Sequence, residues 1–307
     1  MIDARALAAM VAAYLVLPFL VNGVIVRTKA RWAGRKGPPL FQLLFDVRRL
    51  LRKDAVRSTA TTPVFVVGAW TTLATSLAAA LFVPTLFRTA ACSFRFDFVA
   101  LAYVYGLGRV WLMLTALDTA SSFEGMGASR EATFSALAEP ALFFALGTLT
   151  LLTPERTLAG LLSAAHTDSL GPAFVALCAV TLFILLQVET ARLPVDDPNT
   201  HLELTMIHEV MILDHSGPEL AAVQLGSAVK MTTLLFMIAS LVNPARGPAA
   251  FAAWALALVI AFAILLAFVE SAIARFRLSA VPRYVLVGAA ASALTLVLGV
   301  LLPRGMP

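Results

Sequence analysis

The sequence predicts an all-α, polytopic integral membrane protein with about eight transmembrane helices and one short amphipathic helix in the membrane interface. Hydrophobic residues make up 60% of the 307 residues and charged residues only 13%, and the mean hydropathy is +0.88. Apolar runs of about 20 residues, the length needed to cross a hydrocarbon core of about 30 Å, recur along the whole chain. Because short connections use up the remaining length, residues 1–307 are expected to form a single membrane domain.

The predicted spans follow the apolar runs in order. They cover residues 5–26, 64–87, 98–117, 132–152, 172–188, 222–242, 249–269 and 283–302. A basic segment rather than a small-residue cleavage site follows the first run, so this run is expected to be retained as a span and not removed as a signal peptide.

Lysine and arginine set the expected orientation. The connection after the first span holds ten of the twenty-three basic residues, whereas connections on the opposite side hold mostly single arginines. Because basic loops stay in the cytoplasm, the loops after spans one, three, five and seven are expected to face it. Topology then explains the net charge of +5, and nucleic acid is not an expected partner.

The first of these loops contains GPPLFQLLFDVRRLLRKDAVRS, residues 37–58. Apolar residues recur at three-to-four spacing from Leu40 to Leu51, with basic residues elsewhere around the turn. This pattern predicts a short amphipathic helix lying in the interface. Two roles fit it: a surface helix that binds lipid headgroups, or the wall of a lateral cavity.

The loop after the third span reads DTASSFEGMGASREATFSALAEP, residues 118–140. Its glycines and other small residues predict an ordered loop, with Ser129 capping a helix that begins near Arg130. Asp118 and Glu131 are expected to be solvated residues near helix ends.

The loop after the fifth span, ETARLPVDDPNTHLELTMIHEVMILDHSG, holds six of the eighteen carboxylates and three of the four histidines. Pro194 and Pro198 fix the backbone on either side of an acidic turn. Such a loop suits docking of a partner or proton transfer, with histidines near pKa 6.5 as relay groups. The alternative is an ordinary solvated connector.

Several chemistries are excluded. The HEVMI run that begins at His208 lacks the second histidine of an HExxH metalloprotease. The three loop histidines are seven residues apart, about 10.5 Å along a straight helix, which is too far for neighbouring ligands of one metal. Cys92 and Cys178 are isolated, and no phosphate loop or nucleophile elbow is present. No metal site is expected, and the chain alone is expected to catalyse nothing.

Three ionisable residues lie deep inside predicted spans. Arg109, Glu139 and Lys230 are each about eight residues from the cytoplasmic end of their span, hence about 12 Å deep. Ionisable groups there are costly and usually face a polar interior. Pro140 interrupts helix hydrogen bonding beside Glu139 and offers a site for water. Either an Arg–Glu pair fixes helix packing or, as we favour, these residues form a proton path.

The third loop resembles a known family. The run Glu189-x-x-Arg192-x-Pro194-x-Asp196, followed by Glu203-Leu204, is similar to the ExxRxPFD…EL signature of the quinone-chamber membrane subunit of the proton-pumping NADH:quinone oxidoreductase, complex I. The fuller text resembles more closely the membrane subunit of group 4 [NiFe] hydrogenases, represented by formate hydrogenlyase subunit 4 and hydrogenase-4 component C. GRKGPPLFQLLFDVRRLLRK and GMGASREATFSALAEP resemble the first two cytoplasmic loops of that family.

Departures from the quinone-reducing pattern favour the hydrogenase branch. Asn199 and His201 stand where the complex I protein has an acidic pair, and VDDP replaces its phenylalanine-containing run. In the hydrogenase branch the subunit anchors a cytoplasmic arm whose large and small subunits carry the nickel-iron site and an iron-sulfur cluster. Electrons then need not reach a quinone.

The resemblance implies a membrane-anchoring and proton-coupling subunit in the inner (plasma) membrane of a bacterium or archaeon, with no cofactor bound by this chain. The implied partners are hydrogenase large and small subunits, an iron-sulfur subunit, antiporter-like membrane subunits and membrane lipid. Two alternatives stay open: a true quinone-chamber subunit of an NADH:quinone oxidoreductase and a stand-alone proton or cation transporter.

The expected site residues fall into two groups. Ionisable residues expected on a proton path are Glu139, Arg109, Lys230, Glu189, Glu203, His208 and Glu209. Residues expected in the docking loops are Arg35, Glu124, Arg130, Arg192, Asp196, Asp197, His201 and Asp214.

Overall fold

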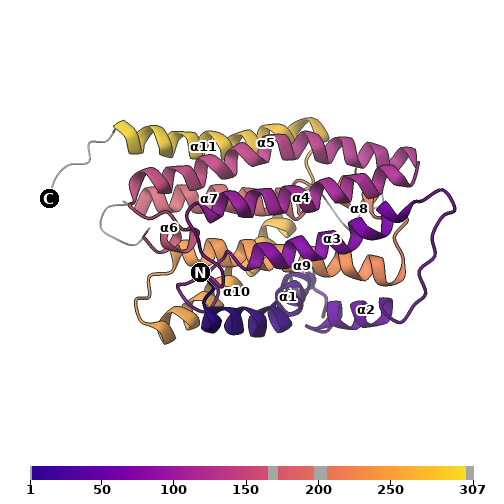
Figure 1. Ribbon diagram of the computed structural model, residues 1–307, viewed down its shortest axis with the longest axis horizontal. Helices are drawn as coiled ribbons and strands as arrows, with labels where there is room; N and C mark the ends of the chain where they lie inside the picture. Colours follow the sequence, from indigo (N-terminus) through magenta and orange to yellow (C-terminus); the bar gives the residue numbers. More distant parts are fainter. Residues whose placement is uncertain (1, 165–171, 197–205, 302–307) are drawn as a thin grey trace.

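The computed structural model describes residues 2–164, 172–196 and 206–301, and it confirms the all-α, eight-span class (Figure 1). The eight long apolar helices are α1 (Ala4–Trp32), α3 (Pro63–Ala80), α4 (Asp97–Asp118), α5 (Ser122–Leu152), α7 (Pro172–Glu189), α9 (Gly217–Val242), α10 (Pro248–Ala272) and α11 (Val281–Leu301). The short elements are α2 (Gln42–Leu50), α6 (Leu158–Ala164), α8 (His208–Met211) and the 3-10 turn η1 (Leu278–Ala280). Within the described residues, strand pairing is limited to an isolated bridge between Ile2 and Cys92.

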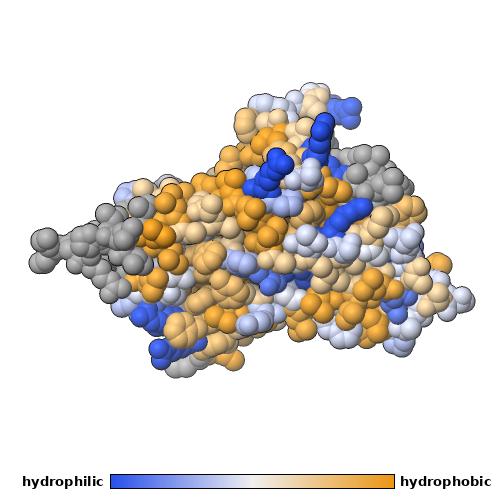
Figure 2. All heavy atoms as spheres, turned by 90° about the horizontal axis from the view of Figure 1, so that it is seen from above, coloured by the Kyte–Doolittle hydropathy of each residue, from blue (hydrophilic) through white to orange (hydrophobic). Residues whose placement is uncertain are grey.

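Helix α9 is the centre of the bundle. It packs against α1, α3, α7 and α10, and its residues are buried along nearly its whole length. Glycines allow the closest approaches: a Cβ at Gly226 would lie 3.1 Å from the backbone of Leu73 on α3, and one at Gly68 would overlap the side chain of Thr115 on α4. On the face that Figure 2 shows, apolar side chains predominate around scattered hydrophilic ones, as expected for contact with lipid or other membrane proteins.

The loops after spans one, three, five and seven meet at one end of the bundle, as predicted. In Figure 1 this is the right-hand end, where α2 and α8 lie. Three side-chain contacts join these loops: Thr62 with Asp118, Arg57 with Glu219, and Arg275 with Asp196. Which aqueous compartment this end faces stays a prediction.

The connections at the opposite end also contact one another. The backbone N–H of Asp3 donates to the carbonyl of Ala91, and that of Phe96 donates to the carbonyl of Arg156. Arg88 hydrogen-bonds the carbonyl of Ala245. The two sets of loops are therefore separated by the length of the spans.

Helix α5 corrects one prediction. It begins at Ser122, ten residues before the predicted span, so the segment expected to be an ordered loop is helical. Ser129 does not cap a helix, because its hydroxyl donates to the carbonyl of Met126 inside α5. Packing explains the loop-like composition: a Cβ at Gly127 would overlap the side chain of Val210 on α8, so only glycine fits this crossing.

The amphipathic helix α2 forms as predicted. Asp46 accepts hydrogen bonds from Gln42 and Arg49, one turn to either side, and these pairs support a helix of only nine residues. Val47 is buried while Phe45 is exposed. Asp118, expected to lie near a helix end, accepts from the backbone and hydroxyl of Thr62 at 2.7 and 2.8 Å at the start of α3.

Candidate functional site: a charged cluster inside the bundle

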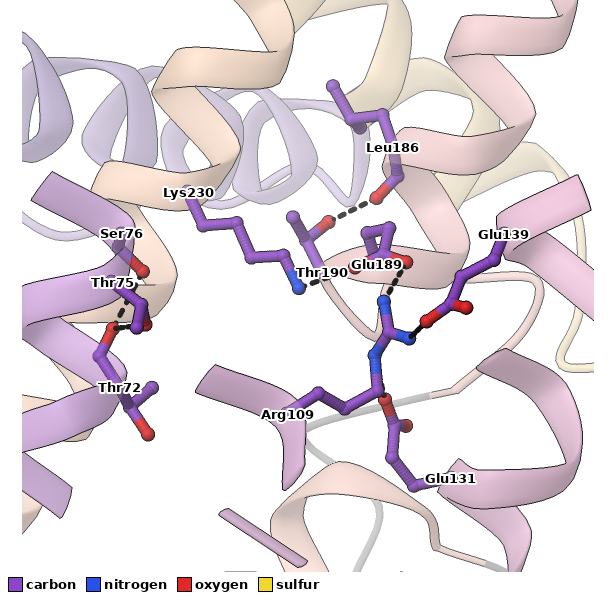
Figure 3. Close-up of polar contacts among 10 residues, drawn as sticks. All are labelled: Thr72, Thr75, Ser76, Arg109, Glu131, Glu139, Leu186, Glu189, Thr190 and Lys230. Carbon is purple, nitrogen blue, oxygen red and sulfur yellow. Dashed lines mark hydrogen bonds and ion pairs between the residues drawn. The ribbon is translucent and has the colours of Figure 1, made fainter. Parts of the chain in front are cut away.

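Arg109 on α4 is the hub of a buried charged cluster (Figure 3). Its side chain is 6% exposed and faces three carboxylates from two other helices. One terminal nitrogen donates to Glu139 of α5 and the other to Glu189 at the end of α7, each at 2.6 Å. Its Nε lies 3.4 Å from Glu131 of α5. A planar guanidinium with several fixed donors suits such a branched arrangement.

Lys230 of α9 completes the cluster. Its Nζ lies 2.5 Å from the second carboxylate oxygen of Glu189 and 5.1 Å from the centre of the Tyr105 ring. Glu189 therefore bridges Arg109 and Lys230. Two cations face three carboxylates, so the fully ionised cluster carries one negative charge and a single proton neutralises it.

A small polar cavity adjoins this cluster. Its volume is about 30 Å³, and because one water needs about 10–15 Å³ of such space, the cavity has room for about two waters. Hydroxyls from α3 line one side of it, since Thr72, Thr75 and Ser76 are turned toward the cluster (Figure 3). His208 and Lys230 also line it.

The segment after α7 links the cluster to the third loop. Helix α7 ends at Glu189, Ala191 adopts a left-handed conformation with φ 48°, and the N–H of Arg192 donates back to the carbonyl of Gln187. This reversal closes the helix in the manner usual for a left-handed C-terminal residue. It leaves Glu189 pointing into the bundle while the chain turns away.

Asp196 holds this loop together from inside. It is 1% exposed, and its Oδ2 accepts from the backbone N–H groups of Ile207 and His208, at 2.9 and 3.1 Å, where α8 begins. Its Oδ1 lies 2.8 Å from Arg275, beyond α10. Both oxygens of this carboxylate are therefore occupied by contacts within the chain, and a role of Asp196 in docking stays a prediction.

His208 differs from the expected relay group. Burial, together with the nearby charge of Lys230, lowers the pKa of His208 to about 4, so the imidazole is neutral at pH 7. It is half-buried and lines both the small cavity and a larger one. A neutral imidazole can still pass a proton between its two nitrogens, but it does not store one at neutral pH.

The larger cavity lies between α1, α2, α9 and the segment around α8, and its volume is about 350 Å³. Leu43 and Asp46 of α2 form part of its wall, so of the two roles left open for the amphipathic helix this geometry favours the cavity wall. Arg192 and Glu209 also line it. The structure thus places Glu209 beside this cavity.

The predicted docking residues differ in their solvent exposure. Arg35 and Asp214 are exposed. Arg130 is half-buried and donates to the carbonyl of Met206 at 2.7 Å, whereas Glu124 is 1% exposed and accepts from the N–H of Asp214. The remaining predictions, Asp197 and His201 for docking and Glu203 for the proton path, lie outside the described residues.

Two candidate functional residues were not predicted from the sequence. Glu131 was expected to be solvated, yet it faces Arg109; its position two turns before Glu139 on one helix was the available signal. Glu270 of α10 is almost fully buried and lies 2.8 Å from Lys29 and 3.6 Å from Arg192. A carboxylate directly after the end of an apolar predicted span, residues 249–269, was the signal in that case.

Comparison with known proteins shows the family of this chain. The family model described as NADH dehydrogenase matches residues 5–301. The chain belongs to the NADH dehydrogenase family. Within it, hydrogenase-4 component C of Escherichia coli (strain K12) is 26% identical over 230 residues, covering 75% of this chain and 72% of that protein. Formate hydrogenlyase subunit 4 of the same organism is 27% identical over 281 residues, covering 86% and 88%.

A solved structure shares the fold. A chain in the membrane-bound sulfane sulfur reductase, an archaeal respiratory membrane complex, superposes with a TM-score of 0.78 at 19% identity, covering 96% of this chain and 98% of that one. The resemblance to the complex I membrane subunit and its hydrogenase relatives, predicted from the sequence, is confirmed. This member of the NADH dehydrogenase family is a multi-pass membrane protein.

Proposed function

We propose that this chain is the membrane-anchoring and proton-coupling subunit of a formate hydrogenlyase-like or hydrogenase-4-like [NiFe] hydrogenase complex, located in the plasma membrane of a bacterium or archaeon. The single observation that carries the proposal is the excess of one carboxylate in the cluster around Arg109. A structural ion-pair network needs no such excess. An excess carboxylate, in contrast, lets the site take up and release one proton without breaking an ion pair.

The three carboxylates differ in their access to the surroundings. Glu189 is held between two cations, which favours its ionised form. The side chain of Glu131 is 15% exposed on the side of the third loop, while that of Glu139 is 46% exposed on the far side of Arg109. A proton that arrives through the small cavity would be shared by Glu131 and Glu139 across the Arg109 guanidinium. The backbone turn after Glu189 would couple movements of the third loop to this exchange.

Anchoring is assigned to the end of the bundle where α2 and α8 lie. The expected partners there are the hydrogenase large and small subunits and an iron-sulfur subunit, which would hold the nickel-iron site and the clusters. The names of the relatives, a hydrogenase component and a formate hydrogenlyase subunit, support this class of partner. Antiporter-like membrane subunits and lipid are the expected neighbours within the membrane.

The test replaces Glu139 by Gln. The amide keeps the size and the hydrogen bond to Arg109 but leaves two cations facing two carboxylates, so the cluster has no remaining excess charge to neutralise. We expect the arm to stay bound and hydrogenase activity with an artificial donor to persist, while most of the proton gradient in sealed vesicles is lost. Glu155→Gln, at an exposed residue near the opposite end, is the matched control and should pump normally.

Two outcomes would contradict the proposal. Normal pumping by the Glu139→Gln complex would leave the cluster as a packing device. Proton transport by the chain reconstituted alone in liposomes would instead indicate a stand-alone transporter.

A second candidate function, quinone reduction, is favoured by the 350 Å³ cavity beside α2. An aromatic ring with a short apolar tail fits such a volume. Ala228 is 2% exposed at its wall, so Ala228→Phe would fill the cavity. If quinone binds there, electron transfer to a short-chain quinone should fall in this variant and persist in Ala257→Phe, at an exposed residue of α10. If neither complex reduces quinone, the candidate is excluded.

A further inference from the structure

Glu139 is in an unusual position for an ionisable residue of a membrane span. The side chains of Arg109 and Glu189 are 6% and 13% exposed, but that of Glu139 is 46% exposed. Glu139 lies 17 residues after Ser122 and 13 before Leu152, hence about 25 and 20 Å from the two ends of α5. At this depth a half-exposed carboxylate would face hydrocarbon, where ionisable groups are costly and almost always covered by protein.

A groove surrounds this carboxylate on the outer surface between α4 and α5. Its volume is about 370 Å³, and its walls include Tyr103, Leu107 and Val110, which are 72%, 51% and 48% exposed. Gly106 forms a notch in it, since a Cβ there would meet only Oε1 of Glu139, at 3.7 Å. A small residue at such a point is what allows another helix backbone to approach closely in a membrane.

The carboxylate of Glu139 indicates what kind of molecule fills the groove. Oε1 of Glu139 accepts from Arg109, whereas Oε2 forms no hydrogen bond with any part of the chain that the structure describes. A lipid acyl chain offers no donor. A transmembrane helix with a hydroxyl, amide, imidazole or ammonium group at this depth would satisfy Oε2 and cover the apolar walls at the same time.

We infer that the groove between α4 and α5 is the docking surface for a transmembrane helix of a different chain, which crosses α4 at Gly106 and donates a hydrogen bond from a polar side chain to Glu139. This docking surface deepens the proposed function. It rests on that function because it requires the chain to be part of a complex. The helix would close the outer side of the charged cluster and provide the next group to which Glu139 could pass a proton.

The test is site-specific photocrosslinking in native membranes that contain the whole complex. A photoreactive amino acid replaces Tyr103 in the groove or, as a matched control, Trp254 on α10, which is 49% exposed. We expect the probe at position 103 to capture one integral membrane chain, identified by mass spectrometry, with the adduct on a helix that bears a polar donor. Adding Gly106→Leu, which meets little of this chain but fills the notch, should reduce that adduct at least tenfold, whereas Gly106→Ala should reduce it little.

Three results would overturn the inference: adducts with lipid alone at position 103, capture of a second copy of this chain, or a protein adduct that Gly106→Leu leaves unchanged. The control probe at position 254 should show no response to Gly106→Leu. Because the captured chain is identified by its mass, the result does not depend on hydrogenase activity. Capture within a complex that lacks a nickel subunit would support the docking surface while refuting the proposed function.

Discussion

Nη2 of Arg109 and Oε1 of Glu189 lie 2.6 Å apart, and this ion pair connects the interior of the bundle to the third loop. Glu189 is both the last residue of α7 and the first residue of the segment that carries the family resemblance. A displacement of that segment would therefore move a carboxylate that bridges two cations. This relationship gives the cluster a mechanical connection to the end of the bundle where a redox arm is proposed to dock.

The first prediction concerns the hub of the cluster. Arg109→Met would leave three carboxylates facing a single lysine, and breaking buried ion pairs by removing one partner costs about 3–5 kcal/mol. We expect a loss of this order in the free energy of unfolding, measured in detergent with the purified chain. Arg246→Met, at an exposed residue of the opposite end, should change it by less than about 0.5 kcal/mol. Equal stability of the two variants would show that Arg109 is not the hub.

The spans could be predicted because length and apolar composition leave few choices inside a membrane. The start of α5 could not, since Gly127 looks like a loop residue until α8 is seen packed against it. Helix propensity reflects only the local preference of a residue, and here the packing of α8 against α5 overrides it.

The cluster was only partly predictable for a related reason. Depth along each span identified Arg109, Glu139 and Lys230, but depth says nothing about which way a helix is rotated. Glu131 was missed because its helix was expected to begin beside it. The internal contacts of Asp196 could not be predicted, because an acidic turn between prolines looks exposed, whereas its Oδ2 accepts from the N–H groups at the start of α8.

The second prediction concerns docking. Charge reversal at the exposed residue Asp214 should weaken attachment of the hydrogenase arm by about fivefold, as expected for loss of one surface charge pair of about 1 kcal/mol. The measurement is the fraction of arm that sediments with membranes at physiological salt. Asp196→Asn is the control: it should lower stability by weakening the contact with Arg275 yet leave the arm attached. The reverse ranking would identify Asp196, and not Asp214, as the docking charge.

The third prediction concerns orientation. A cysteine at the exposed residue Arg35 should resist an impermeant thiol reagent in intact cells, on a background lacking Cys92 and Cys178, because the basic first loop is expected to be cytoplasmic. A cysteine at Arg246, exposed at the other end, should react. Labelling at position 35 but not at 246 would invert the topology, and with it the side on which a redox arm could bind.

The last prediction concerns the pH dependence of stability. His215 is 4% exposed and its ring stacks on Phe65 of α3 at 4.0 Å. Neither ring nitrogen has a hydrogen-bond partner among the residues that the structure describes. Burial lowers the pKa of His215 to about 4, from 6.5 in the unfolded chain, so the native ring stays neutral while the unfolded chain takes up a proton.

The sign of the effect follows from that difference. This contribution to stability is fully present above about pH 7 and falls as the pH drops through 6.5 toward 4, because the unfolded state binds more protons in that window. At pH 5 the loss should be about 2 kcal/mol, given about 1.4 kcal/mol for each unit of pKa difference. His215→Phe keeps a ring against Phe65 and removes the titrating group, so its unfolding free energy, measured in detergent, should fall less between pH 7.5 and 5. Since His208 is retained in the variant, a shallower slope is expected and not a flat one, and identical slopes would show that His215 is already protonated or solvated in the native state.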